Sequence, residues 1–279
     1  MRKILCLLLL STTLHAATPL RVVTVGGAVT ETAFALGSGD VLVGVDTSST
    51  FPEMARALPQ VGYQRALSAE GIASLRPDLV IVSANAGPPT ALAHLAALKI
   101  PVLRLVAGDS LDGATTRVLQ MGEALGREGE ATKLVEKIAS EVGARVPLAA
   151  HSPRVLFVMS LGQGSPMVAG RETAAAAMLE LVGAQNAGNA IQGYKQFSRE
   201  ALVLLDPEIV VTTSRTLAAN GGEADLAKLL PGLEITAAGR SGRLIVMDDL
   251  FLLGFGPRIG EAAQELATKL NEPSRRAER

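Results

Sequence analysis

The 279-residue sequence predicts an α/β protein built from two homologous lobes. Short aliphatic and β-branched runs alternate with helical stretches, a pattern typical of parallel sheets assembled from βαβ units. Features of the first half also return in the same order in the second half, as Ser68 does 130 positions later at Ser198. One long amphipathic segment between the halves indicates that a single helix joins them.

Six runs are expected to form strands, because each is aliphatic and bounded by Gly, Pro or polar residues. In chain order they are residues 21–25, 79–82, 101–105, 154–158, 209–212 and 243–246. Gly26 and Gly27 follow the first run and precede a predicted helix over residues 30–36, which Gly37 ends. These glycines lack the G-x-G-x-x-G spacing, so they indicate a strand-to-helix turn rather than a dinucleotide site.

The connecting helix is expected within residues 128–146, which contain no proline. Ala131, Leu134, Ile138 and Val142 lie on one stripe of it. At about 1.5 Å per residue it would be roughly 28 Å long. The resulting domain boundaries are residues 17–126 for the N-terminal lobe, 127–147 for the inter-lobe helix, 148–270 for the C-terminal lobe and 271–279 for a frayed polar tail.

The internal repeat rests on an ordered set of matches between two segments. Tyr63 and Tyr194, each preceded by Gly, are 131 positions apart. The residue pairs that return at a spacing of 130 are Ser68 and Ser198, Glu70 and Glu200, Pro77 and Pro207, and Asp78 and Glu208. A single match arises easily by chance, but an ordered set indicates two copies of one structural unit.

Residues 1–16 have the organisation of a secretory signal peptide, with a basic start, an apolar run and a small residue, Ala16, at the expected cleavage point. The run is too short for a membrane anchor. Cys6 lies inside this run rather than after it, which argues against lipidation, and its removal leaves no thiol for a disulfide or metal site. The formal charge of −1 gives no indication of nucleic-acid binding.

Enzymatic chemistry is not expected from this residue set. Beyond residue 16 the histidines are His94 and His151, too few for a triad or for a zinc or manganese site with converging ligands. The sequence contains no G-x-S-x-G motif, so the hypothesis of an exported α/β hydrolase has no candidate nucleophile.

Residues 62–72, 75–80, 165–170 and 255–258 carry a family resemblance. On these motifs the chain resembles the haem-binding periplasmic proteins that serve ABC importers, which are related to cobalamin- and siderophore-binding ones. Gly-Tyr-x-Arg-x-Leu-Ser at 62–68 is the haem-specific part, whereas Arg-Pro-Asp at 76–78 is shared by the superfamily. The resemblance implies two Rossmann-like lobes with a ligand cleft between them, haem b as transported ligand, and a periplasmic monomer that docks on an inner-membrane permease dimer, with an outer-membrane haem receptor as a further partner.

The resemblance makes Tyr63 the axial ligand of the haem iron and Arg65 its supporting cation. A phenolate is a hard anionic donor that suits ferric iron. Because a free phenol has a pKa of about 10, the iron and a nearby cation must favour its ionised form. On an extended segment, Arg65 would point to the same side as Tyr63.

Tyr194, the counterpart of Tyr63, is a candidate pocket residue. Three roles stay open for it: approach to the opposite haem face, contact with a propionate, or packing within its own lobe. Residues 160–164 contain no His that would serve as a second axial ligand. Met167 is a candidate distal contact, with packing as the alternative.

Arginines are the expected partners of the haem propionates, because a guanidinium binds a carboxylate with two hydrogen bonds. Arg258 and Arg171 are the candidates, while Arg215 is interpreted as an ordinary surface residue. The alternative ligands within the same fold are a ferric siderophore, which would favour clustered Arg, and cobalamin, which would favour Trp, of which the chain has none.

Glu70 and Glu200 are the expected docking residues. The resemblance implies that one Glu from each lobe enters an Arg pocket on a permease subunit. Each follows a Ser by two positions at an expected helix start, so stabilisation of the helix dipole is the alternative role.

Overall fold

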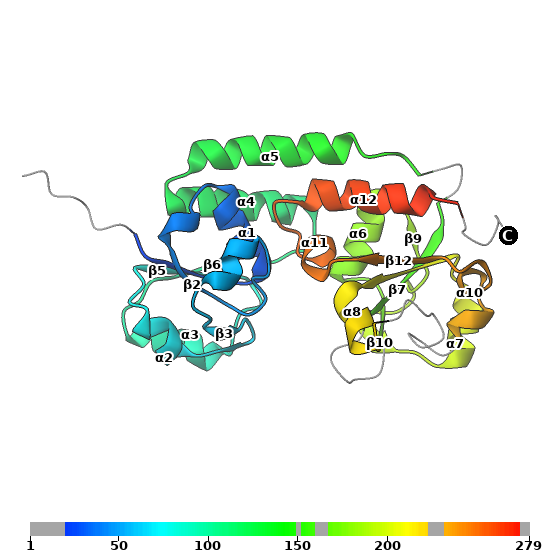
Figure 1. Cartoon of the computed structure of the whole chain (residues 1–279), viewed down its shortest axis with the longest axis horizontal. Helices are drawn as coiled ribbons and strands as arrows, with labels where there is room; N and C mark the ends of the chain where they lie inside the picture. The colour runs from blue at the N-terminus through cyan, green and yellow to red at the C-terminus, as the bar shows by residue number, and fades with distance from the viewer. Residues whose placement is uncertain (1–19, 149–151, 160–166, 223–231, 274–279) are drawn as a thin grey trace, which may run out of the picture.

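Two α/β lobes stand side by side and are joined along one edge by helices (Figure 1). The computed structural model describes residues 20–148, 152–159, 167–222 and 232–273. The expected signal peptide, His151 and residues 160–164 lie outside this part of the chain. None of the helices in the described ranges combines the length and apolarity that a membrane crossing requires.

The first lobe is built on a four-stranded parallel sheet in the order β2-β1-β5-β6. Its strands are β1 (Val22–Val25), β2 (Leu42–Val45), β5 (Leu79–Val82) and β6 (Val102–Arg104). The elements between them are α1 (Gly27–Ala35), η1 (Gly39–Val41), η2 (Glu53–Ala57), β3 (Gly62–Tyr63), β4 (Ala66–Leu67), α2 (Ala69–Ser74) and α3 (Pro89–Ala97). Strand order reverses between β1 and β5, which in open α/β sheets creates a crevice at the carboxyl ends of the strands.

The second lobe contains a six-stranded sheet in the order β10-β8-β7-β11-β12, with β9 also paired to β7. Its strands are β7 (Arg154–Met159), β8 (Met167–Ala169), β9 (Gln185–Asn186), β10 (Tyr194–Gln196), β11 (Ile209–Thr213) and β12 (Leu244–Met247). Its helices are α6 (Ala174–Val182), α7 (Arg199–Leu205), α8 (Ser214–Ala219), η3 (Leu233–Ile235), α10 (Ala237–Ser241), α11 (Asp249–Leu253) and α12 (Ile259–Asn271). The α/β prediction is confirmed, although β8 and β10 pair antiparallel at one edge.

A helical bridge runs along both lobes. It consists of α4 (Leu111–Leu125) and α5 (Glu128–Gly143), with α5 packed on α4 and on α12 of the second lobe (Figure 1). The predicted stripe faces the core, since Ala131, Ile138 and Val142 are buried and Leu134 is partly buried. The helix is shorter than residues 127–147, because the left-handed Gly126 ends α4 just before it and regular structure stops at Gly143.

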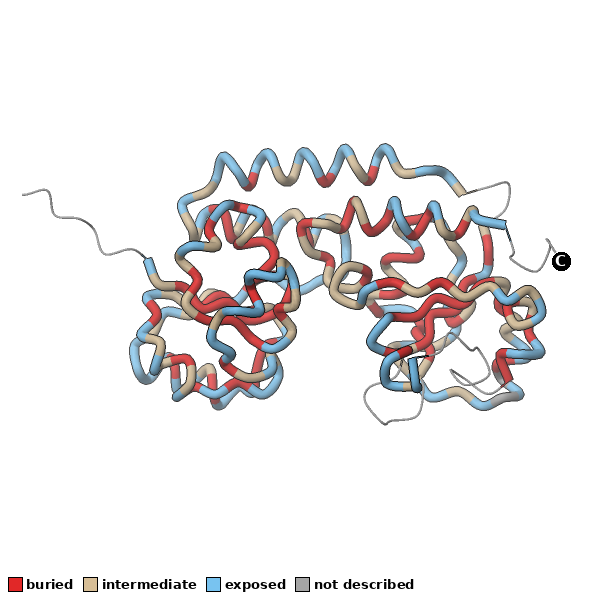
Figure 2. The backbone as a smooth tube through the Cα atoms, viewed as in Figure 1, coloured by how far each residue is buried: buried red, intermediate tan, exposed pale blue. Residues whose placement is uncertain are grey.

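Burial follows the two sheets and the helix faces turned toward them, while the outer side of α5 is exposed (Figure 2). One cluster of buried residues extends through both lobes and the bridge, and includes Met121, Ile138, Phe157 and Phe255. The lobes therefore share a hydrophobic core at the helical edge instead of meeting only through a chain connection.

The internal repeat is visible as a duplicated set of contacts. In the first lobe, the backbone N–H of Arg21 donates to the Asp78 carboxylate at 2.8 Å, and the Asp78 N–H donates back to the Arg21 carbonyl at 2.8 Å. The Arg21 side chain also donates to the carbonyl of Arg76 at 3.1 Å. Arg76 precedes Pro77 and has a φ of 48°, a value uncommon for a residue other than Gly.

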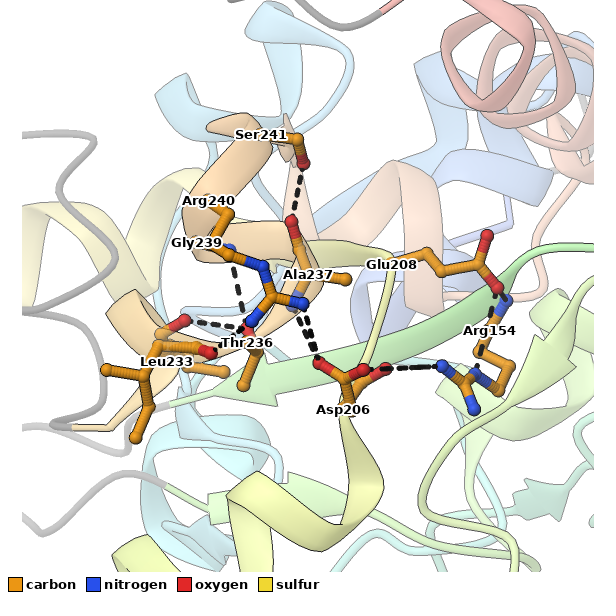
Figure 3. Close-up of polar contacts among 10 residues, drawn as sticks. Arg154, Asp206, Glu208, Leu233, Thr236, Ala237, Gly239, Arg240 and Ser241 are labelled. Atoms are coloured by element: carbon orange, nitrogen blue, oxygen red, sulfur yellow. Dashed lines mark hydrogen bonds and ion pairs between the residues drawn. The ribbon is translucent and has the colours of Figure 1, made fainter.

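The second lobe repeats this arrangement with Arg154, Asp206 and Glu208 (Figure 3). The Arg154 N–H donates to the Glu208 carboxylate at 3.2 Å, and the Glu208 N–H donates to the Arg154 carbonyl at 2.9 Å. The Arg154 side chain donates to the carbonyl of Asp206 at 2.8 Å, and Asp206 has a φ of 33° before Pro207. The Asp206 carboxylate additionally faces Arg240 at 3.7 Å. Equivalent contacts in both lobes confirm that the sequence repeat is a structural one.

Candidate functional site

A cavity of about 510 Å³ opens between the lobes, a volume typical of small-molecule sites. It lies at the carboxyl ends of the strands, where loops from both sheets meet. In the first lobe the residues that follow β1, β2, β5 and β6 contribute Gly26, Gly27, Ser48, Ser83, Ala84, Asn85, Leu105 and Val106. In the second lobe the ends of β7, β11 and β12 contribute Met159, Thr213, Arg215, Thr216, Asp249 and Leu250.

Tyr63 stands on a two-residue hairpin at the cavity wall. Strands β3 and β4 pair Tyr63 with Ala66, so Gln64 and Arg65 form the turn and do not continue an extended segment. Both Tyr63 and Arg65 line the cavity, and 42% of the Tyr63 surface is exposed. Within the part of the chain that the structure describes, Arg65 has no hydrogen bond or ion pair. Its charge is thus available to a ligand.

The hairpin is held from behind by Asp46, whose side chain is fully buried. One carboxylate oxygen accepts hydrogen bonds from the Gly26 N–H at 2.7 Å and the Ser49 hydroxyl at 2.9 Å. The other accepts from the Ser48 N–H at 3.0 Å, the Ser48 hydroxyl at 2.7 Å and the Gln64 N–H at 3.1 Å. A single carboxylate therefore links three cavity loops, which satisfies its own charge and fixes the segment beside Tyr63.

Tyr194 lines the same cavity from the opposite lobe. It lies on β10, which pairs with β8, and follows Gly193, whose φ is 69°. Burial raises the pKa of the Tyr194 phenol, although hydrogen bonds at the start of α6, to the Ala175 backbone and the Thr173 side chain, act to lower it. Nearby Asp109 adds to the increase. Burial therefore favours the neutral form of the partly buried Tyr194 phenol.

Other charges at the cavity are already paired or engaged. Arg215 lies 3.0 Å from Asp249, and the Arg117 side chain donates to the carbonyls of Gly108 at 2.7 Å and Phe255 at 3.0 Å. Burial lowers the pKa of Arg117, against the charge of Asp109. Although Asp109 as a whole is exposed, desolvation of its carboxylate raises its pKa, which Arg117 opposes.

Three predicted pocket residues are not among those lining the cavity. Met167 lies on β8, paired with Met159 and Gln196. Arg171 donates to the carbonyl of Ala190 at 3.3 Å. A haem contact from either residue stays a prediction.

Arg258 is likewise absent from the cavity wall, and its guanidinium binds Glu31 on α1. A contact between Arg258 and a propionate stays a prediction too.

Glu70 and Glu200 are exposed residues in the first turns of α2 and α7. The Ser68 hydroxyl accepts from the Gly71 N–H at 2.9 Å and so caps the N-terminus of α2. Helices α2 and α7 lie in different lobes but on the same side of the molecule, away from α5 (Figure 1). The two helices that carry these carboxylates therefore share one side of the molecule.

Sequence reasoning missed Asp46 as an organising residue, and it missed Arg117 and Asp109 altogether. Asp46 follows β2, a strand that was not predicted because Gly44 interrupts its short aliphatic run. Asp residues commonly occur in turns after strands, so this position alone does not indicate that the Asp46 carboxylate accepts five hydrogen bonds. Asp109 and Arg117 follow β6 and belong to no recognisable motif, and only the fold brings them to the same cavity as Tyr194.

Comparison with known proteins places these features in a family. Residues 22–250 match the family described as periplasmic binding protein. Among solved structures, the chain is similar to the periplasmic heme-binding protein BhuT in complex with two hemes, at 42% identity and a TM-score of 0.83 over 90% of this chain and 97% of that one. It is also similar to the periplasmic heme-binding protein RhuT from Roseiflexus sp. RS-1 in apo form, at 38% identity and a TM-score of 0.86 over 91% of this chain and 98% of that one. A curated relative, the vitamin B12-binding protein of Photorhabdus laumondii, is 28% identical over 95% of this chain and 94% of its own length.

Proposed function

The chain belongs to the periplasmic binding protein family, and from that premise we propose that it captures ferric haem between its lobes and delivers it to an inner-membrane ABC permease. The proposal rests chiefly on one observation: Tyr63 exposes a phenol at the cavity wall, and the same hairpin carries Arg65, which has no ion pair among the described residues. The solved relatives named as heme-binding proteins, 42% and 38% identical, support the same ligand.

The chemistry of the cavity fits a porphyrin with a ferric iron. Leu105, Val106, Leu253 and Phe255 offer an apolar wall to the macrocycle, while Arg65 offers a charge to a propionate or to a ligating phenolate. Tyr63 is the axial ligand in this proposal, because it is exposed at the cavity wall on the hairpin that carries Arg65, whereas burial disfavours the phenolate form of Tyr194. Tyr194 contributes to the opposite wall as a neutral phenol.

The remaining parts of the proposal concern export and delivery. Residues 1–16 act as the signal peptide, and the product works in the periplasm as a binding protein without catalysis. Glu70 and Glu200 dock on the two subunits of the permease, which is supported by the position of their helices, α2 and α7, on one side of the molecule in structurally repeated lobes.

A haemin titration tests the ligand assignment directly. Wild-type protein should give a ferric spectrum with a phenolate-to-iron charge-transfer band, and Tyr63→Phe should lose that band and bind haemin more weakly. Tyr194→Phe is the matched control, since it removes the other cavity phenol and should retain the band. The proposal is wrong if wild-type protein leaves the haemin spectrum unchanged.

Cobalamin is the second candidate, because the curated relative named a vitamin B12-binding protein covers 95% of the chain. A parallel titration with cyanocobalamin distinguishes the two ligands. Tighter binding of cyanocobalamin than of haemin would replace the haem assignment while leaving the family and the transport role intact.

A further inference from the structure

Arg258 makes its contacts across the junction between the lobes. Its Nε donates to the carboxylate of Glu31, which lies 227 positions away on α1. Its guanidinium also lies over two aromatic rings, 3.7 Å from the ring centre of Phe51 and 4.7 Å from that of Phe251. Glu31 and Phe51 belong to the first lobe, whereas Phe251 and Arg258 belong to the second.

The burial of this pair favours a geometric role over a simple stabilising one. The Glu31 side chain is 4% exposed and that of Arg258 is 23% exposed. Ion pairs of this kind gain little net stability, because desolvation offsets their attraction, but they tolerate few alternative arrangements. The two aromatic rings restrict the guanidinium further. Stacking fixes the orientation of its plane, and the hydrogen bond to the carboxylate fixes its direction within that plane.

The same junction brings the two backbones close together beside the cavity. A Cβ on Gly256 would lie 3.3 Å from the Cβ of Ala28, and one on Gly27 would lie 2.7 Å from a Leu250 side-chain carbon. Gly27, Ala28 and Leu250 line the cavity themselves. A small rotation at the junction therefore changes the separation of the two cavity walls.

We propose that Arg258 is a positioning residue that fixes the orientation of the lobes, and hence the width of the cavity, through Glu31, Phe51 and Phe251. This role goes beyond the proposed function, and only its ligand-binding consequence rests on that function. In this proposal Arg258 acts on the ligand through the cavity walls, and this indirect role takes the place of the propionate contact predicted from the sequence.

The orientation of the lobes can be measured in ligand-free protein with paired spin labels. Ala96→Cys on α3 and Ala218→Cys on α8 place exposed labels in different lobes, far from the helical bridge, in a mature protein that no longer carries Cys6. The parent should give one narrow distance distribution by pulsed electron resonance. Arg258→Met should broaden it and shift its maximum, and Arg258→Lys, which keeps the charge but not the planar stack, should give an intermediate result.

Arg240→Met is the matched control, because Arg240 faces Asp206 within one lobe and should leave the distribution unchanged. The proposal is overturned if folded Arg258→Met gives the same distance distribution as the parent. Glu31→Gln is a milder second variant for the same measurement. Haemin affinity should fall about tenfold along with the broadening. A loss of affinity without any change in distance would show that Arg258 contacts the ligand directly and would equally overturn it. Failure of the parent to bind haemin would overturn the haem assignment and leave the distance test valid.

Discussion

The carboxylate of Asp46 accepts a hydrogen bond from the backbone N–H of Gln64 at 3.1 Å, one residue beyond Tyr63. The same buried group binds the loop after β1 and the loop after β2. A residue 17 positions before Tyr63 thus fixes the hairpin that carries it, through hydrogen bonds made within the protein.

Replacing Asp46 with Asn should destabilise the protein by about 3 kcal/mol, because an amide presents donors where N–H and hydroxyl groups already donate. Haemin affinity should fall as well, since the hairpin loses its fixed position. Urea unfolding and haemin titration measure the two effects. Asp40→Asn, at an exposed position, should change stability by less than about 0.5 kcal/mol. Equal effects of the two substitutions would contradict the organising role.

Gly62 requires both a positive φ and open space. Its φ is 98°, and an added Cβ would lie 2.8 Å from the Ala66 carbonyl oxygen across the hairpin. Gly62→Ala should therefore cost about 2 kcal/mol or more and should distort the segment that carries Tyr63. Gly37→Ala is the control that separates backbone strain from steric clash. Gly37 has a φ of 72°, but no atom lies within 4 Å of an added Cβ. Gly37→Ala should cost about 1 kcal/mol and leave haemin binding intact.

Removal of the Arg65 charge should shift the acid release of haemin to higher pH. Without that cation a ligating phenolate is easier to protonate, so Arg65→Met should lose haemin at a pH where the wild type still holds it. Because Arg65 is exposed, its effect on affinity at neutral pH should be about fivefold or less. Arg56→Met, at an exposed position of η2 outside the cavity, should match the wild type at every pH. If Arg65→Met released haemin at the same pH as the wild type, Arg65 would not stabilise the ligating phenolate.

Glu31 should make the stability of the fold depend on pH. Burial raises the pKa of Glu31 above its ordinary 4.5, while the hydrogen bond and charge of Arg258 oppose that increase. Because the folded state binds this proton more tightly than the unfolded state, the associated stability is fully present below pH 4.5 and is lost as the pH rises through the raised pKa. The unfolding free energy of wild type minus that of Glu31→Gln should therefore decrease with pH.

Urea unfolding of both proteins across this range provides the measurement. Glu123→Gln, at an exposed position, is the control and should alter the unfolding free energy by less than about 0.5 kcal/mol at each pH. A difference between wild type and Glu31→Gln that grows with pH would reverse the sign of the argument.

Docking on the permease should depend on both lobes. Glu70→Gln combined with Glu200→Gln should abolish haem uptake through the cognate permease without altering haemin affinity, because neither residue lines the cavity. Glu128→Gln with Glu130→Gln changes the same number of charges on α5, away from the side that carries α2 and α7. This control should transport normally. Normal uptake by the Glu70 and Glu200 double variant would remove these residues from the interface.

Prediction from sequence was most successful where one local signal was sufficient. The strand expected at residues 79–82 is β5, because an uninterrupted aliphatic run fits a strand buried on both faces. The helix expected from residue 30 begins at Gly27, since glycine usually indicates a turn and its role as a close-packed helix start is not visible locally. The antiparallel strands β8 and β10 were missed because each has only 3 residues, too few to show a period.

The candidate site was predictable only in part, for a related reason. Tyr63 and Tyr194 were identified through the repeat, and both line the cavity. Arg258 was expected near the ligand, but its partner Glu31 is 227 positions away, and no property of either neighbourhood links them. Such contacts depend on how the two lobes pack, which one-dimensional patterns do not encode.

The shared core beneath α4, α5 and α12 also bears on how the partner would recognise a loaded carrier. A hydrophobic core shared along one edge resists a wide separation of the lobes, because opening that edge would expose buried apolar surface. The permease would then distinguish the ligand-bound from the ligand-free protein by the side chains that line the cavity, such as Tyr63 and Arg65, and not by a change in overall shape. Such a permease would have to contact these two side chains, or the ligand bound to them, to recognise the loaded protein.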